Sequence, residues 1–227
     1  MSPISLKNIF KGLLIGMTLI ASIMVGLTIS TKYLKSTEIA AKTSVEAGRF
    51  IEIGDTFIIG DTAYIQIYDS IGSIDSRSFW SKVKHLKCFN IKRVVIYINS
   101  QGGVLPDAFA IIDTIIELKN QGIIVEAHVR GIALSAAIPI VSVCSRRIAG
   151  KDTMFFVHNA RLNIIDQSES DRLGLQMFAK KYVNFLAAHT NLSAKEWKLK
   201  MIEEVWFDSR TALKWGLIDE ILEEKEM

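Results

Sequence analysis

Between residue 56 and about residue 222, apolar residues follow two alternating patterns. One pattern consists of short, nearly continuous apolar runs, which are typical of strands covered on both faces. The other repeats every three or four residues, as in a helix with one buried side. The predicted strands are Tyr64–Ile67, Val94–Ile98, Ile123–Val129 and Met154–Val157. Because they alternate with helices, they predict an α/β fold whose sheet is at least partly parallel.

The helices predicted between and after these strands differ in length and in their buried side. They begin at a capping Asp75, near Pro106, at about Ala136 (with Pro139 in the first turn and an end near Ser145), at residue 169 and near Asp208. The fourth runs to residue 189 and the fifth ends near Gly216. The predicted buried side chains are Phe79, Trp80, Val83 and Leu86 in the first helix, Ile112, Ile115 and Ile116 in the second, and Leu173, Met177, Phe178 and Leu186 in the fourth. Asn99–Gly103 is predicted to be a turn.

A different pattern occupies the N-terminus, where residues 12–31 contain no charged side chain. A helix of this length spans about 30 Å, the hydrocarbon thickness of a bilayer. The stretch exceeds the apolar part of most signal peptides and no A-x-A cleavage site follows closely, so we expect an uncleaved transmembrane anchor. The expected organisation is a basic tail at 1–11, the anchor at 12–31, a polar linker at 32–55 and a folded domain at 56–227. A short basic tail usually stays in the cytoplasm, which would place this domain on the exported side.

Composition narrows the classes of function. The chain of 227 residues has a net charge of +3, which is too small and too evenly spread to indicate nucleic acid as the main partner. Its two cysteines, Cys88 and Cys144, exclude a disulfide scaffold and a CxxC metal or redox site, and we expect both to be buried free thiols. Neither HExxH nor GxxxxGK[ST] occurs, so we expect no metal, no cofactor and no ATP hydrolysis by a P-loop.

Three places in the predicted domain are candidates for chemistry. Gly102 and Gly103 follow a buried strand, where glycine serves either an ordinary turn or the close approach of backbone N–H groups to a ligand. Ser135 stands at a helix entry, where it either caps the helix or acts as a nucleophile beside the N–H of Ala136. Of the four histidines, His158 is the best candidate for a base because it follows a strand end, although a packed structural histidine fits equally well.

Six segments, read together, resemble the proteolytic subunit of Clp protease, a family of serine peptidases in the Clp/crotonase superfamily. The matches are Tyr97–Gly103 with Y-I-N-S-P-G-G, Ala110–Thr114 with A-I-Y-D-T, Gly131–Ala136 with G-x-A-A-S-M, Phe156–Asn159 with M-I-H-Q, Leu186–Thr190 with L-A-x-H-T, and Ala212–Asp219 with E-A-x-x-x-G-L-I-D. They occur in the family's order over the region from Tyr64 to Asp219. The resemblance implies a spiral domain of repeated ββα units and leaves the membrane segment outside it.

The resemblance also implies roles for individual residues. Ser135 would be the nucleophile, His158 the base, and the N–H groups of Gly103 and Ala136 the oxyanion hole. The family's aspartate position falls on Glu204, with Asp208 as the competing acid. The substrate would be an extended polypeptide bound along Gly102, Val104 and Leu105. We expect a homo-oligomer, and an unfoldase ATPase as partner only if the domain is cytoplasmic.

Several departures from the family pattern leave other interpretations open. Gln101 replaces the proline of the glycine turn, Asn159 and Ala160 replace Gln-Pro after the histidine, and Ile202-Glu203 replaces an acid-Arg pair used between stacked rings. A membrane peptidase with a Ser-Lys dyad would use Lys180 or Lys181 as the base instead of His158. A crotonase-like acyl-CoA enzyme would share only the fold and the oxyanion hole, and a non-catalytic scaffold would keep only the fold.

Overall fold

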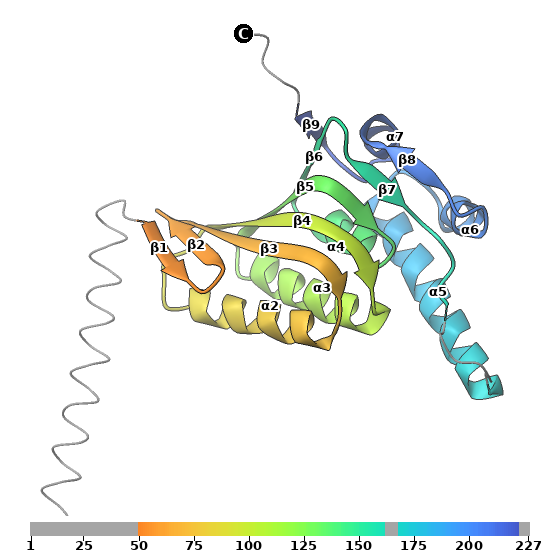
Figure 1. Ribbon diagram of the computed structural model, residues 1–227, viewed down its shortest axis with the longest axis horizontal. Helices are drawn as coiled ribbons and strands as arrows, with labels where there is room; N and C mark the ends of the chain where they lie inside the picture. Colours follow the sequence, from red (N-terminus) through yellow and green to blue (C-terminus); the bar gives the residue numbers. More distant parts are fainter. Residues whose placement is uncertain (1–49, 162–167, 223–227) are drawn as a thin grey trace, which may run out of the picture. The chain divides into compact units, whose positions relative to one another are not determined.

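The computed structural model describes residues 50–161 and 168–222. In chain order its elements are β1 (Phe50–Ile53), β2 (Thr56–Ile59), β3 (Thr62–Ile71), α2 (Ser73–Leu86), β4 (Arg93–Gly103), α3 (Leu105–Asn120), β5 (Ile124–Leu134), α4 (Ala137–Val143), β6 (Arg146–Gly150), β7 (Met154–Phe156), α5 (Glu169–His189), α6 (Ala194–Ile202), β8 (Trp206–Asp208), α7 (Ser209–Lys214) and β9 (Glu220–Leu222). Figure 1 shows how they are arranged.

A single sheet organises these elements, with the order β1-β2-β3-β4-β5-β6-β9. Strands β3, β4, β5, β6 and β9 run parallel, whereas β1 and β2 join through antiparallel pairs at one edge. The last residues of β5 leave β6 and pair instead with β7, which continues antiparallel to β8. The expected α/β fold with a partly parallel sheet is therefore confirmed, and the branch at the end of β5 brings β7 beside the segment that carries Ser135.

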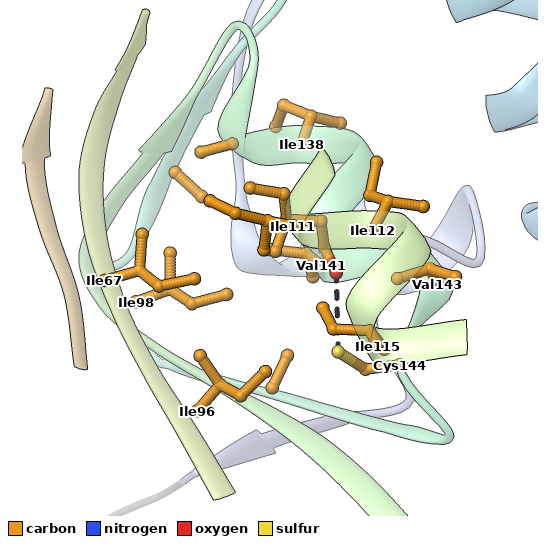
Figure 2. Packing of buried hydrophobic residues seen from close by; sticks show 14 of the residues in the cluster. Ile67, Ile96, Ile98, Ile111, Ile112, Ile115, Ile138, Val141, Val143 and Cys144 are labelled. Carbon is orange, nitrogen blue, oxygen red and sulfur yellow. Dashed lines mark hydrogen bonds between the residues drawn. The ribbon is translucent and has the colours of Figure 1, made fainter. Parts of the chain in front are cut away.

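Helices α2, α3 and α4 cover one face of the sheet (Figure 1). In the core, Ile67, Ile96 and Ile98 of the strands face Ile111 and Ile115 of α3 (Figure 2). Each of these isoleucines is buried. Full burial of one such side chain contributes about 1.5–3 kcal/mol to folding. This packing fixes where β4 and β5 end, and the site lies at those ends.

The central strands extend further than the apolar runs predict. β4 continues through Asn99–Gly103, which the sequence predicts to be a turn, and β5 continues to Leu134. The extension is possible because polar residues here have partners: the buried Ser100 donates its hydroxyl to the carbonyl oxygen of Asp69 at 2.5 Å. Irregular register near Asp69 and Ser100 lets the strands bend around the site.

Three details of the predicted helices need correction. Gly72, not Asp75, is the N-cap of α2, and the Asp75 carboxylate accepts the N–H of Gly72 at 2.8 Å from the third helical position. Trp80 is 51% exposed rather than buried. α4 ends at Val143, before the predicted end near Ser145.

Helix α5 has the predicted bounds but not the predicted buried face. Only its second half packs on the domain, through Tyr182, Val183 and Leu186, because its first half projects beyond the sheet (Figure 1). Consequently Leu173 and Met177 are 58% and 65% exposed, and Phe178 is also exposed.

Several short elements are not predicted from the sequence. β1 falls in residues assigned to the linker, and β2, β6, α6, β8 and β9 are also additional. Arg147 of β6 holds the C-terminal part in place. Its guanidinium donates to the carboxylate of Asp219 and to the carbonyl oxygens of His189 and Gly216. One side chain thus ties β6 to α5, α7 and the approach to β9.

Two predictions concern regions or residues away from the sheet. The expected anchor at 12–31 lies outside the described residues. Within residues 50–161 and 168–222, no helix combines the length and apolar character that a bilayer crossing requires. Both cysteines are free, as expected, but only Cys144 is buried and Cys88 is exposed.

Candidate functional site

Ser135 lies in the two-residue turn between β5 and α4. Its φ is +52°, a left-handed conformation that costs a non-glycine residue roughly 1–3 kcal/mol. Two hydrogen bonds hold it there: the Ser135 N–H donates to the carbonyl oxygen of Phe156 at 2.7 Å, and the Tyr182 hydroxyl donates to the Ser135 carbonyl oxygen at 2.9 Å. Hydrogen bonds from β7 and α5 thus hold the backbone of the turn. The side-chain hydroxyl of Ser135 takes no part in them and can contact other groups.

Of the two glycines at the end of β4, Gly102 packs directly against this turn, whereas Gly103 packs against the backbone of Ile71 in β3. Gly102 has a φ of +87°, and a Cβ added there would lie 2.4 Å from the Leu134 carbonyl oxygen and 2.9 Å from the Ala136 nitrogen. Only glycine allows such an approach. Ala136 precedes the first residue of α4, where backbone N–H groups lack partners within the helix. The close approach places Gly103 and Ala136 on neighbouring backbones, an arrangement suited to binding an oxyanion.

His158 lies two residues after the end of β7, and its imidazole contacts the hydroxyl of Ser135. Its Nε2 lies 2.8 Å from the Oγ of Ser135, and its ring stacks on Phe156 with centroids 5.3 Å apart. The residue before His158 is held by the segment that leads into β8, because the N–H of Val157 donates to the Val205 carbonyl oxygen at 3.1 Å. In a neutral imidazole with its proton on Nδ1, Nε2 accepts the serine hydroxyl proton. This is the contact that a nucleophile and its general base require.

The two candidate acids are placed differently. The β7–β8 register pairs Phe156 with Trp206, and the bond from the Val157 N–H to the Val205 carbonyl oxygen continues it by one residue. Glu204 comes directly before Val205 and has a φ of +53°, so the chain leaves strand conformation there, near the backbone of His158. The Glu204 carboxylate, however, forms an ion pair with Arg161, and among the described residues no hydrogen bond joins it to His158. Asp208 caps α7 by accepting the N–H of Thr211 at 2.9 Å. That N–H holds the pKa of Asp208 below its usual value.

A pocket of about 600 Å³ opens beside Ser135 and His158. Of the residues predicted from the sequence, it is lined by Gly103, Val104, Leu105, Ser135, Ala136 and His158. Gly102 lies behind the Ser135 turn rather than in the lining, and Glu204 is joined to the pocket through Arg161. The remaining lining is largely apolar and includes Phe178 and Met201. The pocket therefore suits an apolar side chain next to a backbone held along the end of β4.

Two residues of the site are absent from the sequence-based prediction. Tyr182 gives no signal beyond helical spacing, because its role depends on how α5 packs against Ser135. Arg161 lies three residues after His158 and is 64% exposed, so its sequence position alone favours no partner.

The other candidate bases have different contacts. The Nζ of Lys181 lies 4.2 Å from the centroid of the Phe109 ring, and within the described part of the chain neither Lys180 nor Lys181 bonds to Ser135. His128 contacts Glu126, while the Nδ1 atoms of His85 and His189 lie 2.7 Å from carbonyl oxygens in their own helices. His158 is therefore the histidine that the fold brings to the serine.

Comparison with known proteins gives consistent results. The family model described as Clp protease matches residues 56–225. The chain is 29% identical over 150 residues to the ATP-dependent Clp protease proteolytic subunit of Streptococcus mutans, covering 61% of this chain and 72% of the relative. It is 26% identical over 155 residues to the protein of the same description from Carsonella ruddii, covering 64% and 76%. A solved structure of a ClpP1 mutant from Listeria monocytogenes superposes with a TM-score of 0.65 at 21% identity, covering 71% of this chain and 92% of that one.

Proposed function

Because the chain belongs to the Clp protease family, we propose that it is a membrane-anchored serine endopeptidase that hydrolyses extended polypeptides. The observation that supports this most directly is the contact of 2.8 Å between the Oγ of Ser135 and the Nε2 of His158 at the mouth of a largely apolar pocket. A scaffold that had lost activity would have no need to keep these two groups in reach of each other.

The proposed reaction is acyl transfer through a covalent intermediate. Ser135 Oγ attacks the scissile carbonyl carbon while His158 takes the hydroxyl proton, and the N–H groups of Gly103 and Ala136 bind the oxyanion. The peptide C–N bond then breaks as the imidazolium returns the proton to the leaving amine. Water, deprotonated by His158, attacks the acyl-enzyme and releases the carboxylic acid and Ser135.

Glu204 is the third member in this proposal. Its support is the hydrogen bond from the Val157 N–H to the Val205 carbonyl oxygen at 3.1 Å, because these two residues are the chain neighbours of His158 and Glu204. The substrate backbone would run along the end of β4 at Gly102, Val104 and Leu105, adding a strand to the sheet there.

The membrane anchor and the assembly state belong to the same proposal. Residues 12–31 contain twenty consecutive residues without a charge, which supports a single membrane span with the peptidase domain on the exported side. The exposed Leu173 and Met177 on the projecting half of α5 support self-association with a second copy of the chain. An unfoldase ATPase enters only if the domain faces the cytoplasm.

Labelling with a fluorophosphonate probe tests the proposal, because the probe forms a covalent adduct with an activated serine. The wild-type chain and a Ser145→Ala control, which changes an exposed serine outside the pocket, should be labelled. Ser135→Ala should be unlabelled and should lose hydrolysis of fluorescein-labelled casein by several orders of magnitude while keeping its melting temperature. Absence of labelling in the wild type would contradict the peptidase proposal, and labelling of Ser135→Ala would contradict the choice of nucleophile.

A further inference from the structure

Arg161 joins the rim of the pocket to the proposed third acid. It lies three residues after His158, lines the pocket and forms an ion pair with Glu204. Both side chains are accessible to solvent, with 64% of Arg161 and 42% of Glu204 exposed. Among the described residues that line this pocket, Arg161 is the one from the group of lysine, arginine, aspartate and glutamate. Its guanidinium can therefore move without disturbing the core.

One carboxylate faces two possible partners here. The hydrogen bond between Val157 and Val205 brings the backbone of Glu204 near that of His158, yet the side-chain bond found for its carboxylate in the described part of the chain goes to Arg161. The lining contributed by the turn between β5 and α4 and by helices α5 and α6 offers no alternative acid among the described residues. These residues are Ser135, Ala136, Leu175, Phe178, Tyr182 and Met201, and none carries a carboxylate. Asp208 is occupied by the N–H of Thr211. Glu204 is thus the carboxylate for which the base and Arg161 compete.

We propose that Arg161 is a positioning residue that competes with His158 for Glu204 and thereby sets the fraction of molecules with a complete triad. The inference rests on the proposed function, because it concerns the residues assigned to that reaction. When Glu204 pairs with Arg161, the Nδ1–H of His158 lacks the carboxylate that orients the ring and stabilises the imidazolium. When the pair opens, the same carboxylate becomes available to His158.

The size of the effect follows from the exposure of the pair. Exposed ion pairs are weak, and breaking one shifts an equilibrium by about fivefold at most. Arg161→Gln should therefore raise kcat by roughly two- to fivefold with little change in KM. Arg161→Lys should raise it less, because lysine retains the charge but not the planar fork that matches a carboxylate. If Arg161 had only a structural role, Arg161→Gln would lower kcat instead of raising it.

A double-mutant cycle on the full chain in detergent tests the competition, with hydrolysis of fluorescein-labelled casein as the readout. Glu204→Gln alone should reduce kcat strongly, and adding Arg161→Gln in that background should change nothing further. Lys195→Gln, which removes an exposed positive charge at the start of α6, serves as the matched control and should leave kcat unchanged. A fall in kcat for Arg161→Gln, or an equal rise in the Glu204→Gln background, would overturn the inference.

A second readout does not depend on catalysis. An Nδ1–H that is hydrogen-bonded to a carboxylate gives a far-downfield proton resonance in NMR spectra. This resonance should be stronger in Arg161→Gln than in the wild type and absent when Glu204→Gln is added. If the wild type reacts with the fluorophosphonate probe but neither kcat nor this resonance responds to Arg161→Gln, the competition is wrong while the peptidase proposal stands. If the resonance responds but the probe never reacts, the peptidase proposal fails and the competition for Glu204 remains.

Discussion

At the scale of single residues, Gly102 shows how closely two turns must meet to form the site. Both Gly102 and Gly122 have positive φ, +87° and +80°, but a Cβ at Gly122 meets nothing within 4 Å, whereas one at Gly102 meets the backbone around Ser135. Gly122→Ala therefore measures the free-energy cost of a positive φ alone, without the steric clash that an added methyl group would cause at Gly102.

We expect Gly122→Ala to lower the free energy of unfolding by about 1–2 kcal/mol and to leave labelling of Ser135 intact. Gly102→Ala should cost about 1–3 kcal/mol more, because the added methyl group displaces the turn of Ser135, and should abolish labelling by the fluorophosphonate probe. Denaturant unfolding and probe labelling measure the two effects. Normal labelling of Gly102→Ala would show that the close approach is not needed for the reaction.

Glu204 and Asp208 can be distinguished by substitutions that keep their shape. Glu204→Gln should cut turnover strongly without changing the melting temperature, since its side chain is exposed and its proposed role concerns the imidazolium. Asp208→Asn should keep most activity because asparagine caps a helix about as well, while Asp208→Ala should lower the melting temperature. An inactive Asp208→Asn together with a normal Glu204→Gln would exchange the two roles.

The sequence predicts which two candidate side chains meet at the site better than it predicts their surroundings. The contact between Ser135 and His158 agrees with the roles implied by the family motifs. The partner of Glu204 could not be predicted, because the Arg161 that binds it lies 43 positions away and depends on the β7–β8 pairing. The assignment of Glu204 as the third catalytic member stays a prediction.

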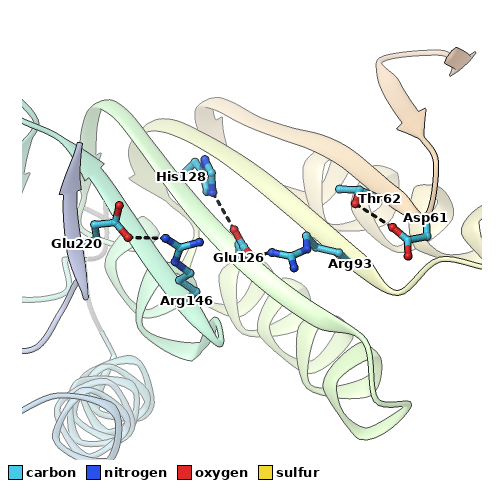
Figure 3. Close-up of polar contacts among 7 residues, drawn as sticks. All are labelled: Asp61, Thr62, Arg93, Glu126, His128, Arg146 and Glu220. Atoms are coloured by element: carbon cyan, nitrogen blue, oxygen red, sulfur yellow. Dashed lines mark hydrogen bonds and ion pairs between the residues drawn. The ribbon is translucent and has the colours of Figure 1, made fainter. Parts of the chain in front are cut away.

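At the scale of secondary-structure elements, strand β5 contains a buried carboxylate, Glu126, that pairs with basic side chains of β4 and β5. Glu126 lies between Arg93 of β4 and His128, with its Oε2 3.1 Å from the Nε2 of His128 (Figure 3). Burial raises the pKa of Glu126, but the hydrogen bond with His128 and the charge of Arg93 outweigh it, and the net pKa lies below its usual value. The ionised form of Glu126 thus stabilises the folded state.

The lowered pKa of Glu126 means that acid should weaken the folded state. A carboxylate with a lowered folded-state pKa contributes stability above its unfolded value of 4.5, and the contribution is lost as pH falls through the lower folded value. Glu126→Gln should be less stable than the wild type by about 1–3 kcal/mol at pH 7. The gap in melting temperature between the two should narrow as pH falls below about 4.5. A gap that widens in acid would contradict the assigned direction.

Elements with a long apolar period are predictable here, and short elements held by distant partners are not. Helix α5 has the bounds that its pattern predicts, from residue 169 to residue 189. β6, β8 and β9 have three to five residues each and depend on pairing with β5, β7 and β6. Helix α6 did carry a local signal, because Ser193 and Glu196 form a capping box at its start.

At the scale of the whole molecule, the proposed membrane anchor at residues 12–31 is open to a direct test. We expect alkaline carbonate to leave the full chain in the membrane pellet and detergent to release it, because the uncharged stretch is long enough to span a bilayer. Added protease should digest the domain from the exported side only. Release by carbonate, or a mature N-terminus at or beyond residue 31, would contradict the anchor.

The overall architecture could be inferred from the sequence because three independent features, the apolar runs, the order of strands and helices, and the family motifs, agree with one another. Apolar runs such as Val94–Ile98, the βαβ order and the family motifs all lead to an α/β fold with a partly parallel sheet, which the structure has. The helices α2, α3 and α4 cover one face of this sheet, whereas the run Val94–Ile98 predicted a strand covered on both faces. The β1–β2 hairpin could not be foreseen, since Phe50–Ile53 is too short to stand out from the preceding polar residues.

The pairing of β7 with β8 also bears on how the protein is made. His158 follows β7, and the strand that pairs with β7 comes near the end of the sequence, at Trp206–Asp208. A ribosome releases the chain from its N-terminus, so Ser135 and His158 emerge while β8 is still untranslated. The nascent chain therefore lacks the strand that supports the position of His158 until translation is almost complete. The order of strands along the gene thus delays the β7–β8 pairing, and with it the supported position of His158, until the last part of the domain is made.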